Sequence, residues 1–320
     1  MPVQGSNVCV GIDAGSVASK LAYSDSLSTR IIAQCEGFDP LELREEAEIF
    51  FDEPVFSCVV ALNEGTTARQ KDVLVSQAKS SGFREVETIP AHEAIALGLD
   101  DDARVLVYDF GASRSEMIIL EGGEVLESDI IPDVCGNEFD KAFSEYLCEL
   151  RGLKKIDEAL IREARRLKHI LSEETSRMWH NFDIQREDFT RLVRFPVRRA
   201  SHTVNMLMKV WKPSRFVLTG GCANIPMVRE VFGNAEITGG LIVRGASLRA
   251  LALTKKETRR NIADNISRMK GLRADILGIE EKLTRSQKDR LYVLFRQVEG
   301  MNDAGMTSLL EGLVREIKQA

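Results

Sequence analysis

The stretch from residue 105 to residue 120 has a pattern of apolar and polar positions that predicts two paired strands. An apolar run over 105–108 ends at Asp109, small residues occupy 111–113, and a second apolar run covers 117–120. Two apolar runs joined so tightly are typical of a strand, a turn and a second strand.

The N-terminal part of the chain repeats this pattern. An apolar run over 8–12 leads into Asp13, a turn contains Gly15 and Ser16, and a second strand is expected over 20–23. An acid at the end of a buried strand, followed by very small residues, suits a phosphate group. The acid approaches the metal ion of the phosphate, and uncovered backbone N–H groups face its oxygens. Two such hairpins, far apart in the chain, predict two facing lobes.

Strands and helices alternate through the rest of the chain up to about residue 253. In the first of these helices we expect the apolar positions to come from Leu41, Leu43, Ala47, Ile49 and Phe50. Period-two and period-3.6 patterns predict strands over 29–33, 55–62, 86–89, 124–131, 179–184 and 216–219, and helices over 39–51, 66–81, 91–99, 160–171, 189–210 and 244–253, with further helices beginning at 136 and 225.

The strand pattern stops after these elements. Apolar residues at steps of three and four predict an amphipathic helix over 262–283. Thr284 and Gln287 form a plausible capping box for a second helix. A turn over 300–305 precedes a third helix over 309–317. The C-terminal part is therefore expected to be a small helical bundle or arm.

Composition and charge narrow the class of protein. The 320 residues suffice for about two domains, and 44% apolar with 29% charged residues is typical of an ordinary soluble globular protein. A net charge of -6 offers no concentrated basic surface, so nucleic acid and anionic membranes are not expected as partners. We interpret short basic clusters such as Arg165, Arg166 and Lys168 as solvated helix faces.

Targeting and cysteine signals favour the cytoplasm. Residues 1–7 are polar, and no apolar run reaches the roughly 18 residues of a membrane span. The six cysteines are scattered, without a Cys-x-x-Cys pair, and buried thiols in a reducing compartment are expected. We therefore expect a cytoplasmic protein.

Five motifs, by their order and spacing, resemble the actin-like ATPase superfamily, and within it the DnaK-type seventy-kilodalton heat-shock chaperones. They are GIDAGS, YDFGAS, PAHEAIALGLD, CGNEFD and VLTGGCANIPMV, and the resemblance covers roughly residues 8–255. It implies an α/β fold of two ribonuclease-H-like lobes: lobe I over 1–103, and lobe II with a returning helix over 104–255. A C-terminal helical arm over 256–320 follows, and it does not resemble the β-sandwich peptide-binding domain of the chaperones.

The resemblance also implies ATP or ADP with Mg²⁺ as the ligands. Asp13 and Asp109 would serve as the catalytic acids and would hold the metal through water. The alternative for each is an Asp that fixes its own turn. The other residues that the resemblance assigns to the nucleotide are Gly15, Ser16, Val17, Gly111, Ala112, Ser113, Gly136, Lys168, Ser172, Gly220, Gly221 and Asn224.

For two of these groups of residues, a purely structural role stays open as the alternative. The helix with Lys168 and Ser172 can instead be a surface helix with a solvated basic face, and His169 stands where the family usually has an arginine. Gly220 and Gly221 can simply permit a turn into the next helix.

Departures from the family pattern indicate weak catalysis. The family's Gly-Gly-Gly-Thr loop is replaced here by a sequence that ends in Ser113 and Arg114, and the added Cβ atoms narrow the room for a phosphate. Ile89 stands at the position of the family's water-positioning glutamate, with His92 and Glu93 on the next turn. An isoleucine can neither orient nor deprotonate water.

Two further departures concern the first lobe. The chain between Tyr23 and Val55 is too short for the subdomain in which the chaperones carry a lysine that reaches the phosphates, and Lys20 is not a substitute for it. Val17 stands where the family has a second threonine, so one hydroxyl is lost.

Three functions follow as hypotheses. The first is a DnaK-like ATP- or ADP-binding protein with slow or absent hydrolysis, which acts as a nucleotide-controlled chaperone-like or regulatory protein on an unidentified protein partner. The alternative is an actin-like filament or scaffold protein. A small-molecule kinase of the same superfamily ranks last, because no acceptor-activating base is evident. The C-terminal helices either buttress the core, which we prefer, or transmit the nucleotide state to a partner.

Overall fold

The computed structural model describes residues 8–25, 27–99, 101–131, 133–279 and 304–319, and single positions between 283 and 295. The predicted capping box of Thr284 and Gln287 lies outside the described residues, as do the side chains of Ile262 and Ile266 and most of the second C-terminal helix. The chain divides into two compact units, Met1–Leu251 and Ala252–Ala320. The finer division at residues 103 and 255 stays a prediction.

The first unit contains a five-stranded sheet built from the N-terminal part of the chain. Its strand order is β3-β2-β1-β4-β5. β2 and β3 run antiparallel to their neighbours, whereas β4 and β5 run parallel to β1. The strands are β1 (Cys9–Asp13), β2 (Ala18–Ser24), β3 (Thr29–Glu36), β4 (Ser57–Leu62) and β5 (Glu85–Pro90).

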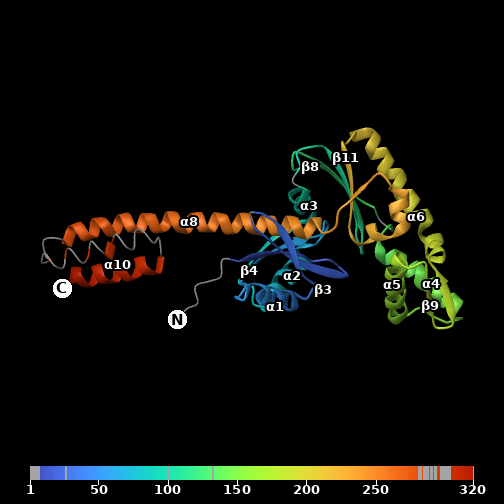
Figure 1. Ribbon diagram of the computed structural model, residues 1–320, viewed down its shortest axis with the longest axis horizontal. Coiled ribbons are helices and arrows are strands. Elements are labelled where there is room, and N and C mark those ends of the chain that lie inside the picture. Colours follow the sequence, from blue (N-terminus) through green and yellow to red (C-terminus); the bar gives the residue numbers. More distant parts are fainter. Residues whose placement is uncertain are drawn as a thin grey trace. The chain divides into compact units, whose positions relative to one another are not determined.

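A second five-stranded sheet repeats this topology with the order β8-β7-β6-β11-β12. Here β7 and β8 are antiparallel, and β11 and β12 are parallel to β6. β1 and β6 are therefore equivalent central strands, and both predicted hairpins are confirmed. Figure 1 labels β3 and β4 of the first sheet and β8 and β11 of the second. The strands are β6 (Val105–Phe110), β7 (Ser115–Glu121), β8 (Glu124–Ile131), β11 (Arg215–Thr219) and β12 (Glu236–Ile237).

Helices α1 (Pro40–Phe51), α2 (Ala68–Ser80) and α3 (Ala91–Leu99) connect or follow strands of the first sheet. α1 buries Pro40, Leu43 and Ala47. Of the five apolar positions expected in this helix, Leu41, Ile49 and Phe50 do not belong to the core, because their side chains are 48%, 75% and 50% exposed. Apolar residues occur on both sides of this helix, so its periodicity did not identify the buried side.

The helices of the second sheet are α4 (Gly136–Leu150), α5 (Glu158–Glu173), α6 (Arg186–Trp211) and α7 (Pro226–Val231), with a 3₁₀ turn η1 (Gly221–Asn224). The single strand predicted over 179–184 was wrong. The chain instead forms a hairpin of β9 (Ser176–Trp179) and β10 (Phe182–Gln185), and His180 makes the turn with a φ of 51°.

Helix α8 (Leu241–Ile279) joins two helices that the sequence predicted separately, over 244–253 and 262–283. The segment between them lacks large apolar residues, but Lys, Glu and Arg are good helix formers and continue the helix. In the second unit, buried side chains of α8 and α10 (Ala304–Gln319) belong to one hydrophobic cluster. Two residues of the turn predicted over 300–305 belong to α10 instead. The cluster comprises Met269, Leu272, Ile276, Leu291, Phe295, Leu310 and Val314.

The first turns of α8 pack closely on the first sheet and on α3. The Ser247 hydroxyl lies 2.6 Å from that of Ser24. A Cβ at Gly11 would overlap the backbone of Ser247, and a Cβ at Gly245 would overlap the backbone of Ala94. Glycine is therefore required on both sides of this contact.

We expect Gly245→Ala to lower the free energy of unfolding by about 1–3 kcal/mol, because the added methyl group must displace backbone. Gly271→Ala is the matched control in the same helix, since a Cβ there meets no atom within 4 Å, and it should cost nothing. Urea denaturation measures both. Equal stability of the two variants would contradict this packing of α8.

Candidate functional site

One cavity of about 660 Å³ is lined by residues from both sheets and their helices. Every residue that the sequence assigned to the nucleotide or the metal lines this cavity. Most of them lie at the ends of strands or in the turns that follow. The lining also includes Asn63, Thr219 and Arg229, which the sequence did not single out.

Asp13 and Asp109 occupy equivalent places in the two sheets. Asp13 is the last residue of β1 and pairs with Ala61 of β4, and Asp109 near the end of β6 pairs with Thr219 of β11. Both carboxyl groups therefore lie where parallel central strands end, and both face the cavity.

The two carboxyl groups act on each other through the cavity. The pKa of Asp109 is raised from 3.8 to about 7, chiefly by burial and then by the charges of Asp13 and Glu116. Burial likewise raises the pKa of Asp13 to about 6. A cation near the two acids would favour their charged forms, which burial disfavours.

Lys20 is a cavity residue that the sequence reading set aside. It faces Asp13 across the antiparallel pair of β1 and β2, so the two side chains share one face of the sheet. Its charge lowers the pKa of both Asp13 and Asp109. The alternation of side chains in the predicted hairpin was the signal that could have identified it.

The second turn is fixed by backbone contacts from α4 and β11. The N–H groups of Gly136 and Asn137 donate to the carbonyl oxygens of Gly111 and Ala112, at 3.1 and 2.7 Å. Gly220 has a φ of 88°, and a Cβ there would come within 2.6 Å of an Asp109 carboxylate oxygen. Glycine at 220 thus permits the end of β11 to approach the acid, which is more than a turn alone requires.

Arg114 brings a positive charge to the edge of this turn. Its guanidinium is 3.2 Å from the buried carboxylate of Glu116.

His92 reaches Glu64 with a distance of 2.9 Å between Nδ1 and Oε2. Ile89 is 5% exposed, at a position within β5.

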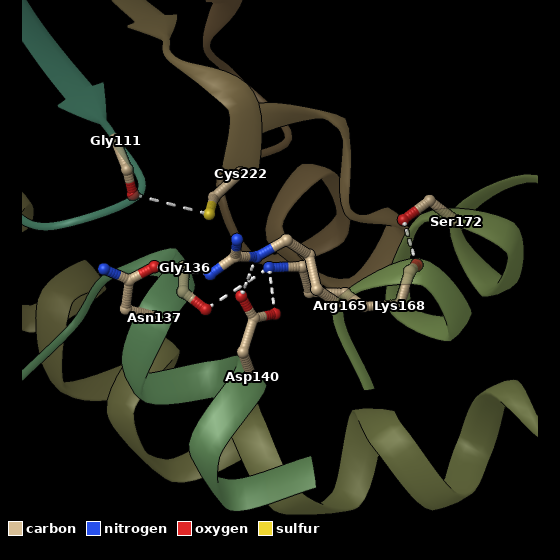
Figure 2. A network of polar contacts seen from close by, with 8 residues as sticks. All are labelled: Gly111, Gly136, Asn137, Asp140, Arg165, Lys168, Ser172 and Cys222. Carbon is tan, nitrogen blue, oxygen red and sulfur yellow. Dashed lines mark hydrogen bonds and ion pairs between the residues drawn. The ribbon is translucent and has the colours of Figure 1, made fainter. Parts of the chain in front are cut away.

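A polar network joins α4 and α5 at another wall of the cavity (Figure 2). Asp140 of α4 accepts from Arg165 at 2.8 Å and pairs with Lys168 at 2.5 Å. Lys168 also donates to the Gly136 carbonyl at 3.2 Å. Its side chain is 7% exposed, so the interpretation of Lys168 as part of a solvated face was wrong. Arg165 is likewise partly buried, whereas Arg166 is exposed as expected.

Two further hydrogen bonds position the cavity residues Ser172 and Asn224. The Ser172 hydroxyl donates to the Lys168 carbonyl at 2.9 Å. Asn224 of η1 accepts from Arg229 through Oδ1 at 2.6 Å. Asp140 ends the CGNEFD motif, but its contacts were not predicted, because Arg165 and Lys168 come from another helix.

Two further observations concern metal ligands and membrane-spanning helices. Over the described residues, His, Cys, Asp and Glu side chains form no group of three or more that could hold a metal. A metal at Asp13 and Asp109 would therefore need oxygen atoms from water and from a bound ligand. In the part of the chain that the structure describes, no helix has the length and apolar character to cross a membrane.

Comparisons with known proteins find weak similarity to seventy-kilodalton heat-shock proteins. The chain is 24% identical over 253 residues to human "Heat shock 70 kDa protein 4L", covering 71% of this chain and 29% of that protein. It is 26% identical over 125 residues to "Chaperone protein DnaK" of Cenarchaeum symbiosum, covering 36% and 19%. It is 24% identical over 239 residues to "Chaperone protein HscA homolog" of Pseudomonas putida, covering 65% and 38%.

No protein-family model matches the chain. The chain spans less than two fifths of the length of each of these relatives. The similarities support a nucleotide-binding domain like that of the seventy-kilodalton heat-shock proteins. They do not assign the activity of the whole relatives to this chain.

We expect the stability of the protein to fall as the pH rises from about 4 to about 7, because folded Asp13 and Asp109 keep protons that the unfolded chain has released. Asp109→Asn removes part of this loss. The variant should match the wild type near pH 4 and exceed it by about 1–2 kcal/mol at pH 8, a value reduced for partial solvent screening.

Urea denaturation at the two pH values measures this difference, and adding Mg²⁺ should narrow it at pH 8 by stabilising the ionised pair. A variant less stable than the wild type at pH 8 would instead show that Asp109 fixes its own turn.

Proposed function

We propose that the chain binds ATP or ADP with Mg²⁺ in the cavity between two ribonuclease-H-like lobes of an actin-like ATPase fold. The observation that carries this proposal is the convergence of the two hairpin turns, α4, α5 and η1 on one cavity that contains both acids. The equal strand order of the two sheets supports it, since duplicated lobes would place two equivalent turns opposite each other.

The residues of the cavity suit the parts of a magnesium nucleotide. Asp13 and Asp109 would hold Mg²⁺ through its water shell, and their mutual repulsion is relieved by a divalent cation. Mg²⁺ supplies charge neutralisation of the phosphates when bound. Backbone N–H groups of the turns at Gly15 and Gly111 would face phosphate oxygens, and Lys20 and Arg114 add positive charge nearby.

The nucleoside would lie toward the second sheet. Lys168, Ser172 and Asn224 line that part of the cavity together with Gly220 and Gly221. Lys168 is already neutralised by Asp140, so it would contribute hydrogen bonding and packing more than net charge.

Hydrolysis is proposed to be slow or absent. Ile89 is buried and offers no group to act on water. Glu93 on the next turn is exposed and does not line the cavity. Ala112 and Ser113 add Cβ atoms to the second turn. Because phosphoryl transfer depends on positioning, these losses would reduce turnover more than binding.

The biological role proposed is that of a nucleotide-controlled chaperone-like or regulatory protein, in the cytoplasm and with a protein partner. Closure of the two lobes on nucleotide would be the switch, provided that the nucleotide prefers the closed state. The names of the relatives support the chaperone-like part.

We expect Mg²⁺–ADP to bind the wild-type protein and Asp109→Asn to weaken that binding at least about tenfold, or about 1.4 kcal/mol. Calorimetry measures the affinity, and phosphate release measures turnover in the same samples. Asp72→Asn, an exposed acid on α2, is the control and should bind normally.

Absence of nucleotide binding by the wild type would refute the proposal. Brisk phosphate release that survives purification and disappears in Asp109→Asn would refute slow hydrolysis alone.

The C-terminal helices can be tested by truncation after residue 255. The second unit has a hydrophobic cluster made only of its own residues among those described, which favours a transmitting arm over the buttress that we preferred from the sequence. The truncated chain should therefore stay soluble, melt within a few degrees of the full chain and bind nucleotide normally. An insoluble or early-melting product would support the buttress.

A further inference from the structure

The cavity wall formed by α4 and α5 has more positive than negative charge. Asp140 is 1% exposed, and it pairs with both Arg165 and Lys168. One carboxylate balances one cation, so one positive charge of this group of three is left over. Lys168 is the more buried cation and the one nearer to Asp140, and the excess charge therefore lies mainly at Arg165.

A second guanidinium with neutral partners comes from α7. Arg229 donates from Nε to the Ala223 carbonyl at 3.3 Å and from Nη2 to Oδ1 of Asn224 at 2.6 Å. Within the described ranges of the chain, no carboxylate forms an ion pair with Arg229. These bonds hold the guanidinium of a cavity residue against η1 and leave its charge unmatched.

Both arginines keep donors for a ligand. Arg165 uses Nε for Asp140 and Nη2 for Asn137, and Arg229 uses the same two nitrogen atoms for its own partners. Among the residues that the structure describes, neither Nη1 group donates to a protein acceptor. A guanidinium that is fixed by some of its N–H groups and open at others is well suited to bind a phosphate.

The walls that carry the two arginines meet at Gly136. Its carbonyl accepts from Lys168 of α5, and a Cβ on this glycine would lie 3.1 Å from the Sγ of Cys222 in η1. Figure 2 shows Cys222, Gly136 and Arg165 grouped at this place. The excess charge thus lies where the nucleoside of the proposed ligand would bind.

The other ionisable groups of these walls do not remove the excess. Burial and the charge of Lys168 lower the pKa of His169, so its ring is neutral at pH 7. Glu173 is exposed at the last residue of α5, where solvent screens its charge. Neither group offers a buried negative charge to the two arginines.

A nucleoside alone would leave these positive charges unmatched, because adenosine is neutral. The phosphates at its 5′ end would be bound at the turns of Gly15 and Gly111, in the other part of the cavity. The base has no acidic group, whereas the ribose hydroxyls are positions at which a nucleotide can carry another phosphate. An anion there would match the charges of Arg165 and Arg229.

We propose that the cavity prefers nucleotides that carry a second phosphate on a ribose hydroxyl, and that Arg165 and Arg229 bind this phosphate. The inference rests on the proposed function, which places the nucleoside against α5 and η1. It adds the class of nucleotide, which the two acids and the two turns do not determine.

Competition calorimetry against ADP, with the full-length protein and Mg²⁺, tests the inference. The probes are AMP, adenosine 2′,5′-bisphosphate and adenosine 3′,5′-bisphosphate, which differ only in the phosphate on the ribose. We expect the wild type to bind one of the two bisphosphates at least about tenfold more tightly than AMP. The preferred isomer identifies the hydroxyl that carries the phosphate.

Arg165→Gln with Arg229→Gln should reduce this preference to within about twofold, and the affinity for ADP should stay within about threefold of the wild type. ADP binding also shows that the variant is folded. Arg229→Gln alone changes an exposed side chain and should lose part of the preference. Arg162→Gln, on α5 but outside the cavity and 63% exposed, is the matched control and should keep all of it.

The outcomes separate this inference from the proposed function. A wild type that binds ADP but prefers neither bisphosphate over AMP would overturn the inference alone. A preference that survives in the double variant would also overturn it, because the ribose phosphate would then be bound by other residues. Failure of every nucleotide to bind would refute the proposed function, and this inference with it.

Discussion

The repulsion between two desolvated carboxyl groups is the constraint on which the rest of the structure depends. Asp13 and Asp109 lie at the ends of equivalent strands. Burial raises the pKa of both, and the charge of Asp13 raises the pKa of Asp109 further than burial alone. A fold keeps such a pair only where something else offsets it. Lys20 and Arg114 offset part of the cost from within the chain, and a magnesium nucleotide is the ligand that would offset the remainder.

The repeated sheet topology explains why Asp13 and Asp109 both line one cavity. In each sheet the central strand has an antiparallel hairpin partner on one side and a parallel strand on the other. The hairpin brings the small-residue turn close to the acid, and the parallel strand ends at the same edge. Glycine at 220 permits the second of these approaches. A similarly close backbone approach occurs at Gly245, where α8 packs against α3.

Local patterns predicted most of this architecture. The hairpins at 8–24 and 105–121 were confirmed because apolar runs and tiny turn residues act over a few positions. Lys20 was missed although its pairing with Asp13 follows from the hairpin. The interpretation of Lys168 as part of a solvated face was wrong because the local sequence shows only a basic cluster. The carboxylate of Asp140, which neutralises Lys168, comes from another helix. In α1, Leu41, Ile49 and Phe50 are exposed although they are apolar, and the sequence pattern did not distinguish them from the buried Leu43 and Ala47.

The most direct test of the account is a crystal structure with Mg²⁺ and a non-hydrolysable ATP analogue. The account predicts the phosphates between the turns at Gly15 and Gly111, the metal between Asp13 and Asp109, and the nucleoside against α5 and η1. The analogue bound elsewhere, or a cavity in which Ala112 and Ser113 occupy the space of the terminal phosphate, would contradict it.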